Sequence, residues 1–434
     1  MGEDLTPRKE RAILVGITLP GMSDWEAEDS LDELGRLIDT AGLKEVERVQ
    51  QARVRIDSAQ YIGKGKAEEI KELAEEHQAD MIVFDNDLSP AQMRNLENTI
   101  KCRILDRSAV ILDIFSRHAR SHTAMIQVEL AQLNYLLPRL TRYWNHLSRQ
   151  AGGGSISGMG AAGVRGPGET QLEIDRRLIR RQVNILSAKL KKIGKQMATN
   201  RKNRADVFKV ALVGYTNAGK STLMRALSGS DVLIEDQLFA TLDSTTRAVD
   251  LDQSKRILLT DTVGFIRKLP KHLFASFRAT LAETEEADLL LHVVDFSHEY
   301  YESQIEAVDK VLGQLEVMDK PRVLVFNKID QLEGAQHSRP LDDGAPKDRV
   351  SVSALSGAGL DTLKEIILFH CRQQDVTLDL QIPQREGRLL SHLHEQGEVL
   401  EKSYEAGDVM VRVRLGRVLA DRWQLERFAP VSVQ

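Results

Sequence analysis

Apolar residues in the first quarter of the chain occur alternately in short runs and at helical spacing. The runs predict strands at residues 12–19, 46–56, 81–84 and 103–105, and the helical spacing predicts helices at residues 30–40 and 67–77 and from Ser89 onward. Strands that alternate with helices are typical of an α/β sheet. We therefore expect a small α/β domain at residues 1–115.

The next segment carries a different repeat, in which apolar positions alternate four and three apart. They fall at Ile126, Leu130, Leu133, Leu137, Leu140, Trp144 and Leu147, and again at Ile179, Val183, Leu186, Leu190, Ile193 and Met197. This heptad spacing predicts two long helices that pack along one seam, with a kink at Pro138. Between them, eight of the 19 residues at 151–169 are glycine. We expect a helical hairpin at residues 116–205 with a glycine-rich tip.

The rest of the chain predicts two further domains. Strand patterns at residues 210–213, 247–251, 256–260, 289–294 and 323–326, with helices between them, predict a doubly wound, mostly parallel α/β sheet at residues 206–372. The last segment, residues 373–434, reads strand, helix, two strands, helix. We expect a small α+β module there, and its pattern suggests no task.

A phosphate-binding loop follows the first strand of the third domain. Its residues match GxxxxGK[ST]: Gly214, Tyr215, Thr216, Asn217, Ala218, Gly219, Lys220 and Ser221, and a helix-like run from Ser221 to Leu227 follows, in which Thr222 is a further expected nucleotide contact. In this strand, loop and helix context, backbone N–H groups cradle the β-phosphate and Lys220 neutralises the β and γ oxygens. The Ser221 hydroxyl is expected to bind Mg²⁺.

Two later stretches complete a nucleotide switch. Asp261, Thr262, Val263 and Gly264 close an apolar strand, so Asp261 is placed to hold the metal through water and the Gly264 N–H to reach the γ-phosphate. Thr241 is the expected switch threonine that ligates Mg²⁺ when the γ-phosphate is present, although Thr245 and Thr246 lie nearby. Phe239 is counted among the nucleotide contacts. We assign the catalytic roles to Lys220, Thr241 and Gly264.

The base is indicated by the two remaining motifs. The Asp330 carboxylate can accept hydrogen bonds from N1 and N2 of guanine, which adenine cannot offer, while Asn327 and Lys328 position and flank the ring. Ser353 and Ala354 fit a loop whose backbone N–H meets the guanine O6 and leaves a polar group unpaired against adenine. The five motifs together predict a P-loop GTPase that prefers GTP to ATP.

One position departs from the usual switch. Phe265 follows Gly264 where many GTPases carry a glutamine that orients water, so we expect slow intrinsic hydrolysis that needs a partner, an ion or another residue. Asn217 offers one route, because related P-loops with asparagine at this place bind K⁺ beside the phosphates. The alternative, that Asn217 only stabilises the loop, stays open.

Composition sets the class of protein. The 434 residues suggest about three domains, and a formal net charge of −5 with 42% hydrophobic residues indicates a soluble globular chain. Its two cysteines, Cys102 and Cys371, lack metal-ligand spacing and point to a reducing compartment. No leader and no apolar run of about 20 residues is present. We expect a cytoplasmic protein, with transient membrane association left open.

One segment is basic, although the chain as a whole is acidic. Eleven Lys or Arg and no Asp or Glu occur between Arg176 and Arg204. Such a block is either a solvated helix face or a contact with phosphate backbones, and its one-sidedness favours salt-dependent binding of nucleic acid. Recognition of a large structured RNA by shape fits better than readout of a particular sequence. The glycines and lysines of residues 61–66 either open the following helix or contact phosphate, and a second nucleotide site there is the weaker interpretation.

The chain resembles the HflX family of bacterial GTPases. Beside the five nucleotide motifs, the resemblance is carried by residues 61–66 (YIGKGK), 127–133 (QVELAQL), 138–140 (PRL), 165–173 (RGPGETQLE), 175–177 (DRR) and 239–243 (FATLD). It implies a GTPase stimulated by the ribosome that binds the large ribosomal subunit and its RNA, dissociates stalled or idle ribosomes under stress, and leaves on hydrolysis. It also implies that the hairpin tip reaches toward the peptidyl-transferase region.

Two rival functions remain on the sequence alone. The first is a nucleotide-switched assembly or regulatory module that binds ribosomes without splitting them. The second is an ATP-driven RNA remodeller that uses the N-terminal domain. We expect a monomer with GTP or GDP and Mg²⁺ as ligands, and a metabolic P-loop kinase is disfavoured because Asn327, Lys328 and Asp330 have no role in one.

Overall fold

The computed structural model describes residues 8–140, 171–202, 207–229, 238–239, 244–252, 255–268, 281–332, 348–405 and 407–429. The chain divides into two compact units. Unit 1 comprises residues 1–194 with the short segments 237–242 and 267–279, and unit 2 comprises residues 195–236, 243–266 and 280–434. The expected glycine-rich tip at 151–169 lies outside the described residues, and the four domain boundaries stay predictions.

The first part of unit 1 is the expected α/β sheet. Four parallel strands lie in the order β2-β1-β3-β4. The elements are β1 (Arg11–Thr18), α1 (Asp24–Thr40), β2 (Lys44–Ala52), α2 (Lys64–Glu76), β3 (Met81–Phe84), α3 (Pro90–Ile100), β4 (Arg103–Asp106), α4 (Arg107–His118) and α5 (His122–Leu136). β1 and β3 are buried almost throughout, as central strands of a parallel sheet require.

Local signals explain where the helices of this part begin. α1 starts six residues before the predicted helix because Ser23 and Glu26 form a capping box, each side chain satisfying a backbone N–H of the other residue. α2 starts directly after Gly63, so Lys64 and Lys66 belong to its first turn. The interpretation of residues 61–66 as a helix opening is therefore confirmed. α4, which the sequence analysis missed, begins where the Asp106 side chain accepts a hydrogen bond from the Ala109 N–H.

The heptad seam of the hairpin is confirmed over the described residues. α7 (Gln171–Lys202) packs on α5 through Val183, Leu186, Leu190 and Ile193, which meet Ile126, Leu130 and Leu133. The expected kink at Pro138 is wrong, since α5 ends at Leu136 and Pro138 lies in a 3₁₀ turn. A proline has no N–H for the helical ladder, and here the chain leaves the helix instead of bending it. Trp144 and Leu147 lie outside the described residues.

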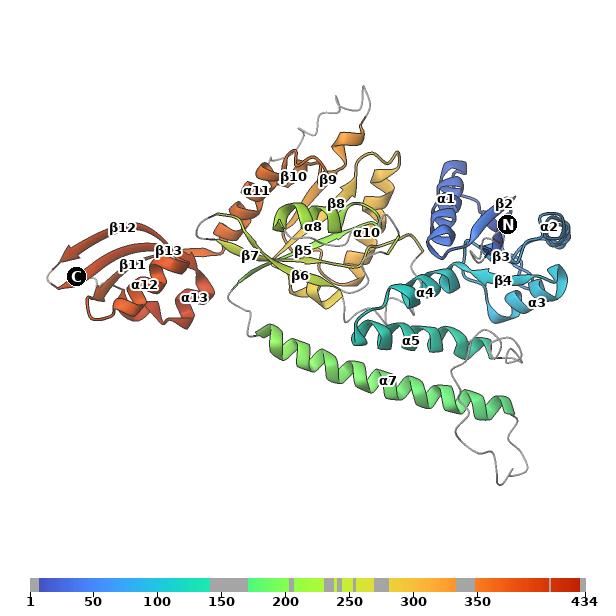
Figure 1. The fold of residues 1–434 in the computed structure, drawn as a ribbon, viewed down its shortest axis with the longest axis horizontal. Coiled ribbons are helices and arrows are strands. Elements are labelled where there is room, and N and C mark those ends of the chain that lie inside the picture. Colours follow the sequence, from blue (N-terminus) through green and yellow to red (C-terminus); the bar gives the residue numbers. More distant parts are fainter. Residues whose placement is uncertain are drawn as a thin grey trace, which may run out of the picture. The chain divides into compact units, whose positions relative to one another are not determined.

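The first part of unit 2 is a six-stranded sheet in the order β10-β9-β8-β5-β7-β6 (Figure 1). Among the described strands of this sheet, β6 alone runs antiparallel, against β7. The elements are β5 (Phe208–Gly214), α8 (Lys220–Ser228), β6 (Thr245–Asp250), β7 (Arg256–Asp261), β8 (Leu289–Asp295), α10 (Tyr301–Gln314), β9 (Arg322–Asn327), β10 (Arg349–Ser351) and α11 (Leu360–Gln373). α8 and α11 contribute to one core cluster and α10 packs in another, so the doubly wound α/β fold is confirmed.

The last part of unit 2 is the expected α+β module. β11 (Asp375–Pro383), β13 (Asp408–Gly416) and β12 (Glu398–Glu405) form an antiparallel sheet in that order, with α12 (Gly387–Gln396) and α13 (Arg417–Arg422). Alternate β13 residues, Val409, Val411, Val413 and Leu415, are buried with Leu393 of α12 and Ala420 of α13. Among the described residues, no helix combines the length and the apolarity that a membrane crossing needs.

A buried histidine makes unit 2 sensitive to acid. His292 of β8 is 1% exposed, and burial, followed by the charges of Arg322 and Lys220, lowers its pKa from 6.5 to about 3. Between pH 6.5 and pH 3 the unfolded chain therefore binds a proton at His292 that the folded chain does not bind. The free energy of unfolding is highest above pH 6.5 and decreases as the pH falls toward 3. At pH 5 the loss from His292 is about 2 kcal/mol.

His292→Gln is expected to flatten this acid dependence by removing the proton uptake on unfolding. The measurement is hydrogen-exchange protection of the β8 peptide at pH 7.5 and pH 5, corrected for intrinsic exchange rates. The exposed His394 of α12 provides the control in His394→Gln, which should leave the dependence unchanged. Equal acid sensitivity of the His292 variant and the parent chain would contradict the assignment.

Candidate nucleotide site

The phosphate loop connects a buried strand to a helix start. β5 ends at Gly214, and Gly219 caps α8, which begins at Lys220. Both glycines have positive φ, and a Cβ would approach the Val293 carbonyl oxygen within 2.2 Å at Gly214 and Asn327 Nδ2 within 2.2 Å at Gly219. No other residue fits these positions without movement of the backbone or of Asn327. The loop therefore holds N–H groups and a helix N-terminus where an anion can approach.

Lys220 is buried at the centre of this loop. Its Nζ donates to the carbonyl oxygens of Tyr215 at 2.7 Å and Gly214 at 3.1 Å. Burial lowers its pKa from 10.5 to about 8, an effect that the nearby Asp261 charge opposes. A cation so poorly solvated gains much from an anionic phosphate, because little water has to be displaced around it.

Ser221 and Asp261 meet as the sequence predicted for a metal site. The Ser221 hydroxyl donates to Asp261 Oδ2 at 2.6 Å, and Asp261 is 2% exposed at the end of β7. Hard oxygen donors of this kind suit Mg²⁺, which P-loop proteins hold with few side chains, substrate phosphates and water. The pair therefore fits the ion. Thr241, the third expected ligand, lies outside the described residues.

Close packing fixes the segment after Asp261. A Cβ on Gly264 would meet Thr216 at 2.8 Å and Lys220 Nζ at 3.0 Å, so this position requires glycine. Phe265 exchanges backbone hydrogen bonds with the phosphate loop and its side chain is 2% exposed. Thr262 donates to the Leu212 carbonyl at 2.6 Å, which makes it a support of β5 in this structure, and Val263 is buried.

Asn327 joins the phosphate loop to the expected base-binding loop. Its Nδ2 donates to the Ala218 carbonyl at 2.9 Å, and its Oδ1 accepts the Ala354 N–H at 3.0 Å. The exposed Asp330 accepts the Ser353 hydroxyl at 2.5 Å, so its carboxylate is held at the surface. Lys328 pairs with Asp295 at 2.7 Å. The structure thus gathers these motifs, but the Ala354 N–H expected to meet guanine O6 donates to Asn327 here.

Among the remaining residues predicted to contact the nucleotide, some are exposed and others are buried. Asn217 is exposed with a φ of 60°, and Thr222 follows Ser221 in the first turn of α8. Phe239 is 3% exposed and packs edge-on against Phe115 of α4, with ring centroids 4.7 Å apart. Its expected nucleotide contact stays a prediction, but its ring is committed to the interior of unit 1.

Two basic residues that the sequence analysis missed follow the Asp261 motif. Arg267 pairs with Asp29, and Lys268 pairs with Asp85 and donates to the Ser30 hydroxyl at 2.9 Å. Asp85 also accepts from the fully buried Arg107 at 2.7 Å. The sequence feature that could have identified Arg267 and Lys268 is their position shortly after the Asp261 motif. Both segments that unit 1 takes from the middle of the chain thus bear residues anchored there, namely Phe239 and Lys268.

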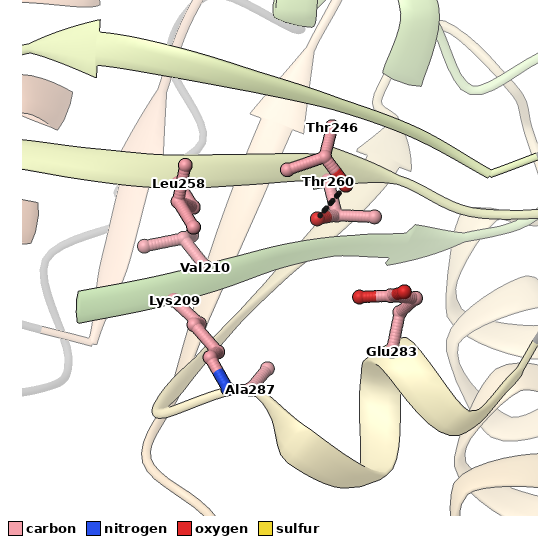
Figure 2. A pocket seen from close by; sticks show the side chains of 7 residues that line it. All are labelled: Lys209, Val210, Thr246, Leu258, Thr260, Glu283 and Ala287. Carbon is pink, nitrogen blue, oxygen red and sulfur yellow. Dashed lines mark hydrogen bonds between the residues drawn. The ribbon is translucent and has the colours of Figure 1, made fainter. Parts of the chain in front are cut away.

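A small hollow in unit 2 is separate from the nucleotide motifs. Figure 2 shows it against β5, β6 and β7, with the hydrogen bond of 3.0 Å between the Thr246 and Thr260 hydroxyls. Its lining residues are Lys209, Val210, Thr246, Leu258, Thr260, Glu283 and Ala287. None of them belongs to the five motifs, which lie at the carboxyl ends of β5, β7 and β9, where open α/β sheets bind ligands.

Comparison with known proteins identifies the family. Sequence profiles match residues 28–116 (GTP-binding GTPase N-terminal), 118–204 (GTP-binding GTPase middle region) and 209–328 (50S ribosome-binding GTPase). GTPase HflX of Caldanaerobacter subterraneus subsp. tengcongensis is 42% identical over 97% of this chain and 94% of its own length, and GTPase HflX of Escherichia coli is 42% identical over 94% and 93%. A GDP complex of a Sulfolobus solfataricus GTP-binding protein aligns with 84% of this chain and 99% of that chain, at 22% identity and a TM-score of 0.42. With its P-loop, its guanine motifs and relatives that match almost end to end, the chain belongs to the HflX family of GTPases, which bind and hydrolyse GTP.

Proposed function

We propose that this GTPase binds the large ribosomal subunit in its GTP state and dissociates stalled or idle ribosomes under stress, and that hydrolysis drives its release. The partner is ribosomal RNA of that subunit, and the protein acts as a monomer in the cytoplasm. The family profile over residues 209–328, described as a 50S ribosome-binding GTPase, supports the choice of partner.

The observation that carries this proposal is the charge on α7. Its apolar seam faces α5, while Arg177, Arg180, Arg181, Lys189, Lys191 and Lys192 are exposed. The seam uses one side of the helix, and the cations lie on the rest of its surface, in a stretch from Arg176 to Lys202 whose sequence contains no Asp or Glu. Such a surface attracts phosphate backbones strongly and without regard to sequence.

The switch residues support a timed release. Mg²⁺ held by Ser221 and Asp261 would draw charge from the β and γ oxygens of GTP. Lys220 neutralises the same oxygens, and Gly264 brings the backbone close to them. Phe265 is buried and cannot orient water, so hydrolysis waits for a group supplied by the ribosome, by K⁺ at Asn217 or by another residue.

A ribosome-binding module without splitting activity is the second candidate. It has the same nucleotide site and the same basic helix, and it differs only in what happens after docking. Light scattering of 70S ribosomes separates the two functions. We expect a fall in scattering with a non-hydrolysable GTP analogue and no fall with GDP or an ATP analogue. Unchanged scattering while binding persists would refute splitting and favour the second candidate.

The role of α7 is tested by neutralising Arg180, Arg181, Lys191 and Lys192 to glutamine. Binding to the 50S subunit should weaken, and the slope of log affinity against log salt should fall by roughly 3. The matched control neutralises Lys44, Arg94, Lys101 and Arg103, four exposed cations of the N-terminal sheet part. If the control loses as much affinity as the α7 variant, net charge and not this helix guides binding.

A further inference from the structure

The turn between β6 and β7 meets the entrance to the C-terminal module within unit 2. Lys255 of this turn places Nζ 2.7 Å from Asp375 Oδ1, and the two side chains are 11% and 2% exposed. Asp375 is the first residue of β11. An ion pair this deeply buried is costly to separate, since either partner alone would be a charge withdrawn from water.

Further contacts gather at the same corner. Asp252 accepts the Lys255 N–H at 2.7 Å and faces Arg372, near the end of α11, at 3.4 Å. The Arg417 N–H donates to the Gln374 carbonyl at 3.3 Å, and Asp375 pairs with Gly416 at the end of β13. The turn therefore touches the point where the chain enters the module and where the module's central strand ends.

The other end of the same hairpin lies at the nucleotide site. Thr245, the first residue of β6, pairs with Asp261, the last residue of β7 and the expected metal ligand. β6 is the edge strand of the sheet and is paired only with β7 among the described strands. A strand rises about 3.3 Å per residue, so β7 connects Asp261 with the turn about six residues away, over roughly 20 Å.

We propose that the Lys255–Asp375 ion pair couples the nucleotide state to the C-terminal module, with Lys255 and Asp375 as positioning residues at the two sides of the contact. The coupling is reciprocal: if GTP in place of GDP changes how the module is held, the module changes the relative affinity for the two nucleotides by the same factor. This gives the module a task that its sequence pattern does not suggest. The inference rests on nucleotide binding and not on ribosome splitting.

The test is hydrogen exchange of the full chain with GDP and with a non-hydrolysable GTP analogue. We expect protection of the β11 and β13 peptides to differ by about fivefold between the two nucleotides. Lys255→Met keeps the apolar stem, removes the charge and should abolish the difference, whereas Lys255→Arg should keep it. Lys255→Met leaves the Asp375 carboxylate buried without its cation. The double variant Lys255→Met with Asp375→Asn removes both charges, and it should also abolish the difference in protection between the two nucleotides.

Arg412→Gln is the matched control. It breaks the exposed pairing of Arg412 with Asp379 and Glu401 in the same small sheet, away from the corner, and should retain the difference. A second readout is the ratio of GTP-analogue affinity to GDP affinity, which should shift in the Lys255→Met and double variants only. Equal protection of the module with both nucleotides, when both are bound, would overturn the proposal. So would a difference that survives in the double variant.

Discussion

Lys220→Ala is expected to abolish binding of both GTP and GDP. Nζ lies between two loop carbonyls at the start of α8, where the phosphates of either nucleotide must approach. Two charge-assisted hydrogen bonds to phosphate contribute about 4 kcal/mol together, which corresponds to a loss of affinity of about a thousandfold. Titration of a fluorescent GDP or GTP analogue measures it directly.

The pH dependence of binding checks the same residue. With a pKa of about 8, Lys220 loses its proton in the nucleotide-free chain as the pH rises beyond 8, and the affinity should fall there. Lys209→Ala, at the opposite end of β5, is the control and should bind normally at every pH. Affinity within threefold of the parent in Lys220→Ala would refute the phosphate-cradle assignment.

Asp330→Asn is expected to transfer preference from guanine to xanthine nucleotides. In the expected guanine contact the carboxylate accepts from N1 and N2, whereas an amide donor in its place would meet the carbonyl that xanthine carries at C2. Ser353 holds the side chain at the surface through its hydroxyl, so the replacement amide starts in the same place. Loss of two hydrogen bonds to a charged acceptor lowers GTP affinity by about a hundredfold or more.

Competition between GTP and XTP for the variant measures the transfer. Asp361→Asn, at an exposed position in the first turn of α11, changes the charge of the domain equally and should leave guanine preference intact. A variant at Asp330 that still prefers GTP would place base recognition elsewhere.

Spacing and pattern were sufficient for most of the fold and for the gathering of the five nucleotide motifs. The P-loop sits between β5 and α8 because its glycines, Gly214 and Gly219, are compatible with that turn and few other residues are. Heptad positions such as Leu130 and Leu186 meet as expected, since a seam is a local property of each helix. The order of motifs placed Ser221 beside Asp261, because the carboxyl ends of parallel strands share one edge.

Some features of the fold could not be predicted from the sequence, above all those that depend on tertiary contacts. α5 ends at Leu136, where a kink at Pro138 was expected, because a proline is compatible with either outcome and the apolar pattern does not decide between them. Nothing in the spacing indicates that Asn327 bonds two loops at once, or that Lys268 reaches Asp85. Such pairings join residues from distant parts of the chain, and their partners are common residue types.

The anchoring of Phe239 and Lys268 in unit 1 bears on any attempt to isolate the GTPase domain. A fragment cut at residues 206–372 would keep both residues but lose Phe115 and Asp85. The Phe239 ring would then be returned to water, and two positions with φ near +59° and +55° would lose the contacts that hold them in this region. The segments that carry Phe239 and Lys268 would no longer be held by these contacts in the fragment. Its rate of GTP hydrolysis would therefore differ from that of the intact chain.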